Sequence, residues 1–364
     1  MTRSFSCRSS LKHRPACTPF FSFTTFPSCK VSRVFKNAVF NGPQRSVGFT
    51  IGAGGTTSDA SNEDPLLIPY KGAALPIRMN TIPHSRELRR HFYDEAASAV
   101  VDALAEKTHQ HLRISVRCTI PELNPEFDVY RIGTLLELVR SIATAIVRSG
   151  SGDQRDFQKS RRVKVCVQQS LGQGVFQGTP LALSGVMRIM NQMDWGSEEV
   201  ADHITTGNLG AKEVEKNDAD AFILIAPQNM TGQSVLPLLQ EMVTAAEVNN
   251  KPIVLINAKL GDIPSSAGVM GIRGRSERQD FVSTFITAYH FRLLYLGIGP
   301  YPIMGALRYR WGGPWQVFRR VDFIDGFGER SECYLKIGDF DHQPDASEIT
   351  ACFKKPVEQR SNAS

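Results

Sequence analysis

Acidic residues are missing from the first 58 residues of this 364-residue chain. That segment has eight Lys and Arg residues and no Asp or Glu, and the first acid is Asp59. The whole chain has 42 basic and 36 acidic residues, a net charge of +6. Without the segment, 34 basic and 36 acidic residues remain, a net charge of about −2. The basic character of the chain is therefore no argument that the remainder binds nucleic acid.

The acid-free segment is also rich in Ser, Thr, Phe and Pro, a composition typical of an organellar transit peptide. Pro15, Pro19 and Pro27 interrupt the long amphipathic helix that a mitochondrial presequence needs, which favours the chloroplast. A disordered basic tail on a cytosolic protein is the alternative. The expected location is the chloroplast stroma, with or without peripheral contact at the thylakoid membrane.

Long hydrophobic runs are also missing. A membrane-spanning helix needs about 20 consecutive apolar residues. The nearest stretch, 293–307, is shorter and is interrupted by glycine and proline, so no transmembrane segment is expected. After the acid-free segment the cysteines are Cys118, Cys166, Cys333 and Cys352, with no CxxC pair. Their spacing predicts buried free thiols and no metal site.

Hydrophobic periodicity predicts an α/β fold in the rest of the chain. Helical spacing covers 84–107 and 131–148, and continuous apolar runs at 220–226 and 253–257 predict strands covered on both faces, as in a parallel sheet. Residues 306–323 read as two strands around Gly312-Gly313, and 194–217 show no clear element beyond a short helix. The expected fold is a three-layer α/β domain with a mostly parallel sheet and an antiparallel C-terminal hairpin.

The predicted organisation has four parts. They are a chloroplast transit peptide at 1–58, a linker at 59–77, a single α/β domain at 78–345 and a loose C-terminal tail at 346–364.

Two loops that follow predicted strands are candidate ligand sites. The first holds Gly172, Gly174 and Gly178 before Thr179, a residue suited to cap a helix. Its spacing is GxGxxxG, which departs from the GxGxxG of dinucleotide-binding loops, so an ordinary strand–helix turn is the favoured interpretation. The second loop carries Asn229 and Thr231, which either cap the next helix or contact a ligand at the carboxyl edge of the sheet.

Arginines and aromatic residues alternate in the predicted hairpin, and such a surface suits a protein partner or single-stranded nucleic acid. The candidate contact residues are Arg308, Arg310, Trp311, Trp315, Arg319 and Arg320. Inward-packed aromatics with outward arginines explain the same alternation without any partner.

Catalytic motifs are not found. Glu122 and Glu126 are two carboxylates on one proline-bounded loop, where solvated or capping roles are the favoured interpretation. The sequence has no P-loop, GxSxG or HExxH. It assigns no catalytic residue, cofactor or metal, and it favours a non-enzymatic protein.

Several segments occur in an order that resembles a known family. They are PEL at 121–123, DAFILIAPQ at 220–228, KPIVLIN at 251–257 and WGGPWQVFRR at 311–320, within about residues 80–340. They resemble an uncharacterised-domain family of plastids and cyanobacteria that includes the chloroplast photosystem II assembly protein Low PSII Accumulation three. The resemblance implies a photosystem II accessory or assembly factor that contacts photosystem II subunits or other assembly factors. It supplies no catalytic residues.

Three functions follow as hypotheses. The first is a photosystem II accessory factor acting by protein–protein contact. The second is a stromal protein that binds a nucleotide or phosphorylated metabolite at the two loops. The third, less favoured, is a plastid RNA-binding protein that uses 308–320.

Overall fold

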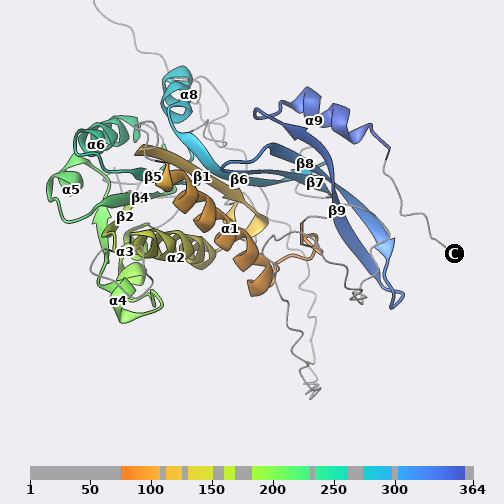
Figure 1. The fold of residues 1–364 in the computed structure, drawn as a ribbon, viewed down its shortest axis with the longest axis horizontal. Coiled ribbons are helices and arrows are strands. Elements are labelled where there is room, and N and C mark those ends of the chain that lie inside the picture. The colour runs from red at the N-terminus through yellow and green to blue at the C-terminus, as the bar shows by residue number, and fades with distance from the viewer. Residues whose placement is uncertain are drawn as a thin grey trace, which may run out of the picture. The chain divides into compact units, whose positions relative to one another are not determined.

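The fold is built on one sheet, seen in a computed structural model of the chain (Figure 1). The structure describes residues 75–76, 78–106, 112–124, 130–150, 160–168, 183–229, 234–260, 274–296 and 302–356. Within these residues the sheet has nine strands in the order β3-β2-β4-β5-β1-β6-β7-β8-β9. The strands are β1 Arg113–Thr119, β2 Val163–Val167, β3 Ile204–Asn208, β4 Ala221–Ile225, β5 Ile253–Ile256, β6 Ile286–Tyr295, β7 Ile303–Arg310, β8 Trp315–Ile324 and β9 Arg330–Phe340.

The sheet is parallel from β3 to β6 and antiparallel from β6 to β9. This arrangement confirms the mostly parallel sheet with antiparallel C-terminal strands. The described helices are α1 Arg86–Ala105, α2 Ile132–Ser149, α3 Leu183–Asn191, α4 Glu198–Ala201, α5 Ala211–Glu215, α6 Leu236–Val248, α8 Arg275–Ser283 and α9 Ala346–Phe353. A 3-10 turn, η2, covers Pro121–Leu123.

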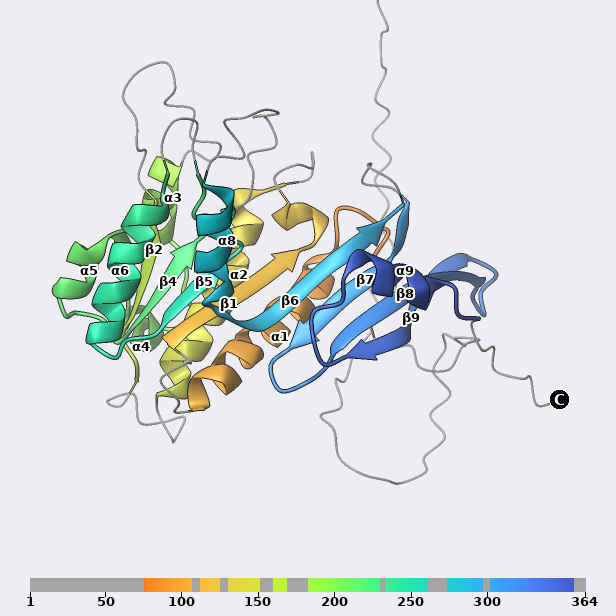
Figure 2. The same ribbon diagram turned by 90° about the horizontal axis from the view of Figure 1, so that it is seen from above.

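Alternate residues of the central strands pack into different layers because successive side chains of a strand point to opposite faces. In β4, Ile223 and Ile225 belong to the core cluster beneath α1 and α2, whereas Phe222 and Leu224 pack with α5, α6 and α8. All five residues of β4 are buried. The continuous apolar runs in the sequence reflect this burial on both faces, and they confirm the three layers (Figure 2).

The antiparallel strands have a separate small core. Leu307, Trp315 and Val317 pack on one face of β7 and β8 with Ile349 and Cys352 of α9. On the opposite face, Ala306 and Phe318 belong to the same cluster as α1. Helix α9 therefore covers the C-terminal strands on the face away from α1 (Figure 1).

Two elements differ from the sequence interpretation. Residues 194–217, where only a short helix is expected, also contain β3, and residues 346–353 of the expected loose tail form α9. Strand β3 lies at the edge of the sheet, so it lacks a strongly apolar run and only two of its five residues are buried. Helix α9 has only eight residues, too few to be stable without tertiary packing, and a capping box of Asp345 and Glu348 begins it.

Candidate functional site

The carboxyl ends of the parallel strands meet at one edge of the sheet, where α/β proteins commonly bind ligands. Strands β2 and β4 are neighbours, but the chain leaves them toward opposite faces. Helix α3, which follows β2, packs with the α1–α2 layer, whereas α6, which follows β4, packs in the other layer. The two loops singled out in the sequence therefore begin side by side at a topological switch point.

Two glutamines join the starts of these loops. Gln228 donates its backbone N–H to Gln168 Oε1 at 2.9 Å, and Gln168 Nε2 donates to the carbonyl of Gln228 at 3.0 Å. Both residues are buried, and the Gln228 Nε2 atom has no hydrogen-bond partner in the part of the chain described. The pair fixes the two strand ends together and leaves one buried amide donor unused.

Asn229 lies next along this edge, and its side chain has local partners. Its Oδ1 accepts from the backbone N–H of Val235 at 3.1 Å, and its Nδ2 donates to the carbonyl of Leu260 at 3.4 Å. The first bond holds the chain at Val235, directly before α6, although α6 itself has no side-chain cap, and ligand binding by Asn229 stays a prediction. The other predicted ligand residues, Gly172, Gly174, Gly178, Thr179 and Thr231, lie outside the described residues.

Backbone geometry at the same edge is unusual. Ala226 and Asn257, directly after β4 and β5, have φ values of +40° and +46°, in the left-handed region that costs energy for residues other than glycine. The Asn257 side chain bridges to β1, accepting from Cys118 N at 2.7 Å and donating to Cys118 O at 2.8 Å. These contacts fix the carboxyl ends of β4, β5 and β1 in place.

The predicted partner residues of β7 and the following turn contact α1. Arg308 pairs with Glu95, Arg310 reaches Asp102 at 2.7 Å, and Trp311 Nε1 donates to Glu106 at 3.1 Å. Glu95 and Asp102 lie about two turns apart on α1, and Glu106 directly follows its last residue. These side chains hold α1 on the sheet.

The predicted partner residues of β8 are also in contact with the protein itself. Trp315 is buried and stacks on Tyr309, with ring centroids 4.8 Å apart. Arg319 donates to the carbonyls of Phe353 and Lys355 at the end of α9, and Arg320 pairs with Glu332 of β9. Whether any of these residues also meets a partner stays a prediction.

A buried acid–histidine pair lies near the start of the domain. His84 Nδ1 lies 3.0 Å from Glu122 Oε2, and Nε2 lies 2.6 Å from the carbonyl of Met79. A carboxylate and a carbonyl both accept, so each nitrogen of the ring faces a hydrogen-bond acceptor of the protein. Burial raises the pKa of Glu122, but hydrogen bonds and charge from His84 outweigh burial, and its pKa is lowered overall. The pair is suited to stability, while Glu126 lies outside the described residues.

The sequence matches one family over residues 86–351, most of the chain, and that family is described as a domain of unknown function, DUF1995. The chain belongs to the DUF1995 family. The match begins at the first residue of α1 and ends within α9, so it contains all nine described strands. The family thus corresponds to the whole described sheet and its covering helices.

Within the DUF1995 domain, a second buried ionic cluster lies between β2 and α5. Lys164 is buried, and its Nζ donates to Glu213 at 3.1 Å and to Asp218 at 2.6 Å. Burial lowers the pKa of Lys164, but the two carboxylates outweigh burial and its pKa is raised overall. The neighbouring Gly207 leaves the space for this cluster, since a Cβ there would lie 2.9 Å from Glu213 Oε2. A lysine held charged in this way is a structural group.

The described part of the DUF1995 domain has no metal-binding cluster, since no three or more His, Cys, Asp or Glu residues there could hold a metal ion. Burial raises the pKa of the Cys118 thiol to about 12, which keeps it in the unreactive thiol form. No helix of the described residues is both long and apolar enough to cross a membrane.

Proposed function

We propose that this DUF1995 protein is a chloroplast accessory factor for photosystem II assembly that acts by protein–protein contact. The transit-peptide composition and the family resemblance support the compartment and the process. The observation that supports protein contact is a rigid turn between β8 and β9 that exposes large apolar side chains. Phe327 is 74% exposed and Ile324 is 61% exposed.

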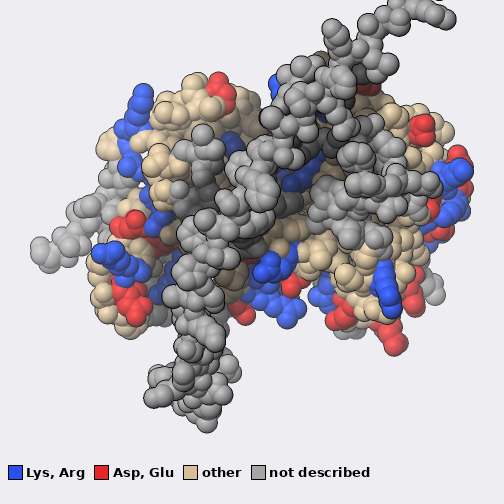
Figure 3. Space-filling view, turned by 180° about the vertical axis from the view of Figure 1, so that it is seen from behind, with Lys and Arg blue, Asp and Glu red and all other residues tan. Residues whose placement is uncertain are grey.

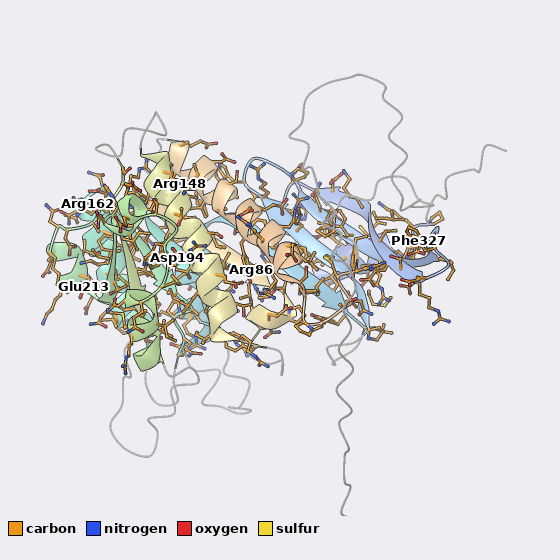
Figure 4. The ribbon with its side chains drawn as sticks, turned by 90° about the horizontal axis from the view of Figure 1, so that it is seen from below. Arg86, Arg148, Arg162, Asp194, Glu213 and Phe327 are labelled. Atoms are coloured by element: carbon orange, nitrogen blue, oxygen red, sulfur yellow. The ribbon has the colours of Figure 1, made fainter. Side chains whose placement is uncertain are left out.

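The turn is held by one buried acid. Asp325 Oδ1 accepts from the backbone N–H groups of Phe327 at 3.0 Å and Glu329 at 2.9 Å. Gly328 has a φ of +79°, which a glycine adopts without strain. Phe327 is therefore presented on an ordered turn at the far end of the hairpin (Figure 4). Ordered aromatic side chains at the surface are favourable anchors for a protein partner because little conformational entropy is lost on binding.

A polar pocket of about 700 Å³ lies beside the turn. Its walls include Arg78, Arg320, Asp322 and Glu329, so charges of both signs lie next to the exposed apolar side chains. An apolar centre with a polar rim is the usual composition of a protein interface. Because the rim carries both signs, it suits a folded protein partner better than a polyanion.

A knockout and complementation experiment tests this proposal. A line that lacks the protein should accumulate less photosystem II on native gels, and the wild-type gene should restore the level. A gene carrying Ile324→Ser and Phe327→Ser should fail to restore it. Val248→Ser is the matched control, since Val248 is 78% exposed at the end of α6, away from the turn. Normal photosystem II in the knockout line would refute the proposed function.

Binding of a nucleotide or phosphorylated metabolite is a second candidate, supported by the Gln168–Gln228 contact at the switch point between β2 and β4. ATP or a sugar phosphate should then raise the melting temperature of the full chain. Gln228→Leu, which removes the unused buried donor, should abolish the increase. Unchanged melting in both nucleotides and sugar phosphates would exclude this candidate.

RNA binding through 308–320 gains no support from the contacts of these residues. The guanidinium groups of Arg308 and Arg310 pair with acids of α1, so single-stranded RNA would have to displace two ion pairs. We therefore do not propose RNA as a partner.

A further inference from the structure

Four polar side chains form a patch on the two strands at the centre of the sheet. Strands β1 and β6 are parallel neighbours, with Arg117 opposite His290 and Thr119 opposite Arg292. The residues between them, Cys118 and Phe291, are buried in the cluster beneath α1. Because side chains alternate along a strand, the four polar residues point to the opposite face. We refer to Arg117, Thr119, His290 and Arg292 as the β1–β6 patch.

No described helix covers this patch. On its face of the sheet, α5, α6 and α8 cover the strands on one side, and α9 covers β7 and β8 on the other (Figure 2). The patch separates these two apolar clusters. Arg117 is exposed although β1 is the fifth of the nine described strands. Lys, Arg, Asp and Glu side chains are interspersed over the side of the molecule that Figure 3 shows from behind.

Arg292 brings to the patch a positive charge that the described residues do not neutralise. It is half-buried, and within the described ranges its side chain makes no hydrogen bond and no ion pair. Burial and the charge of Arg117 lower the pKa of Arg292. By contrast, Arg308 and Arg310 on the other face of the neighbouring strand each pair with an acid. The missing counter-charge therefore distinguishes Arg292 from the arginines of β7.

His290 gives a second and independent indication. It is 4% exposed and packs against Trp315, with ring centroids 5.0 Å apart. Its Nε2 atom is buried and has no hydrogen-bond partner in the described part of the chain. Burial, together with the charges of Arg117 and Arg292, lowers the pKa of His290 to about 3, so the ring is neutral at physiological pH. A buried polar atom without a partner is uncommon in folded proteins and calls for an explanation, such as a bound water, ion or ligand group.

We propose that the β1–β6 patch binds the phosphate monoester group of a soluble molecule. A phosphate monoester is nearly a dianion at neutral pH and offers three strong acceptor oxygens, so it can accept from Arg292 and from the His290 ring together better than a carboxylate does. Guanidinium groups also form paired hydrogen bonds to phosphate oxygens. The neutral His290 ring supplies a further donor. The Thr119 hydroxyl already donates to the carbonyl of Phe291 at 3.2 Å and can still accept.

A soluble ligand fits the patch better than a lipid headgroup. The patch lies on the sheet itself, and α8 and α9 rise on either side of it on the same face (Figure 1). A flat bilayer would meet these helices before it reached the buried His290 ring.

Calorimetric titration of the full chain with phenyl phosphate, a soluble monoester, tests the proposal. Binding should be measurable at an ionic strength fixed with sodium chloride. Arg292→Gln should weaken it at least tenfold, and Arg292→Lys should weaken it less because the charge remains. Arg86→Gln is the control with the same change of charge. Arg86 is exposed at the start of α1, on the other side of the sheet, and should bind as the wild type does (Figure 4).

Melting temperatures of the wild type and of Arg292→Gln distinguish a loss of phosphate binding from a loss of folding. Without phosphate, Arg292→Gln should melt at the same temperature as the wild type or higher, because it removes a half-buried charge that no described residue pairs with. Phenyl phosphate should raise the melting temperature of the wild type and not that of Arg292→Gln. Absence of binding to the wild type, or equal binding by Arg292→Gln and Arg86→Gln, would overturn the proposal.

Two further measurements distinguish a soluble ligand from a lipid headgroup, and the β1–β6 patch from the turn between β8 and β9. Vesicles of phosphatidylcholine with phosphatidic acid should show no binding that depends on Arg292. Arg292-dependent binding to vesicles, with no response to phenyl phosphate, would instead assign the patch to a lipid and reject a soluble ligand. Phe327→Ser should bind phenyl phosphate as the wild type does. The phosphate proposal and the protein-contact proposal can therefore fail independently of each other.

Discussion

Replacement of Glu122 by glutamine tests whether the buried acid–histidine pair stabilises the domain. Glu122 is 1% exposed, and its carboxylate faces His84 Nδ1 at 3.0 Å and also accepts the backbone N–H of His84. The amide of glutamine removes the negative charge and turns one acceptor into a donor that faces another donor. Loss of one member of a buried ion pair typically costs about 3–5 kcal/mol. We expect Glu122→Gln to lower the free energy of unfolding at pH 7 by about 3 kcal/mol, since the glutamine keeps the shape of the side chain.

The effect should depend on pH in a defined direction. The pKa of Glu122 is lowered in the folded protein, so folding favours the ionised carboxylate. Its contribution to stability is therefore complete above the pKa of the unfolded chain, near 4.5, and is lost as the pH falls below it. The difference between wild type and Glu122→Gln should stay constant from pH 7 to about pH 5.5 and begin to shrink as the pH falls through about 4.5.

Urea unfolding followed by circular dichroism at pH 7, 5.5 and 4 measures this difference. Glu137→Gln is the control, because the Glu137 side chain is 36% exposed and its ion pair with Arg89 is worth less than about 1 kcal/mol. A loss of stability that stays constant down to pH 4 would mean that packing, and not charge, explains the effect of Glu122→Gln. A loss below about 1 kcal/mol at pH 7 would contradict the ion pair altogether.

Two further predictions concern packing and the second ionic cluster. Gly305→Ala should destabilise the protein by about 3 kcal/mol in urea unfolding, since its Cβ would lie 2.0 Å from the carbonyl oxygen of Phe318 on the next strand. Gly133→Ala, in α2 with no atom within 4 Å, should instead be neutral or stabilise by about 0.5 kcal/mol, and an equal loss in both variants would refute the argument from close approach. Lys164→Met should lower the melting temperature at pH 7, at a cost of about 1–2 kcal/mol, because Glu213 loses its buried partner and keeps only the exposed Lys216 at 2.8 Å. Partial recovery of Lys164→Met in the Glu213→Gln background would support charge as the cause, and additive losses would contradict it.

The three-layer core could be predicted because its signal is local. A strand buried on both faces needs apolar residues at every position, so β4 and β5 read as continuous apolar runs. Helices α1 and α2 each bury one face of a long helix, and their periodicity marks them. The same reasoning missed β3, whose sequence ITTGN has few apolar residues because the strand lies at an edge. It also missed α9, whose eight residues depend on packing against β7 and β8.

At the candidate sites, local sequence patterns do not predict which side chains pair with one another. The alternation of arginine and aromatic residues in 308–320 was visible in the sequence, but the acids that pair with Arg308 and Arg310 lie more than 200 positions earlier, on α1. His84 and Glu122 are 38 positions apart and carry no spacing signal. Each pairing exists only because the fold brings distant segments together.

Composition and periodicity thus determined the transit-peptide prediction, the α/β class and the buried parallel strands, since each depends on residues close together in the chain. The order of the strands in the sheet determined which residues, distant in the sequence, meet in the candidate sites. Arg117 and Arg292 are separated by most of the domain in sequence, and they meet only because β6 pairs with β1 after a crossover. That Arg292 has no counter-charge among the described residues follows from that pairing, because a counter-charge can be judged only when the neighbours in space are known.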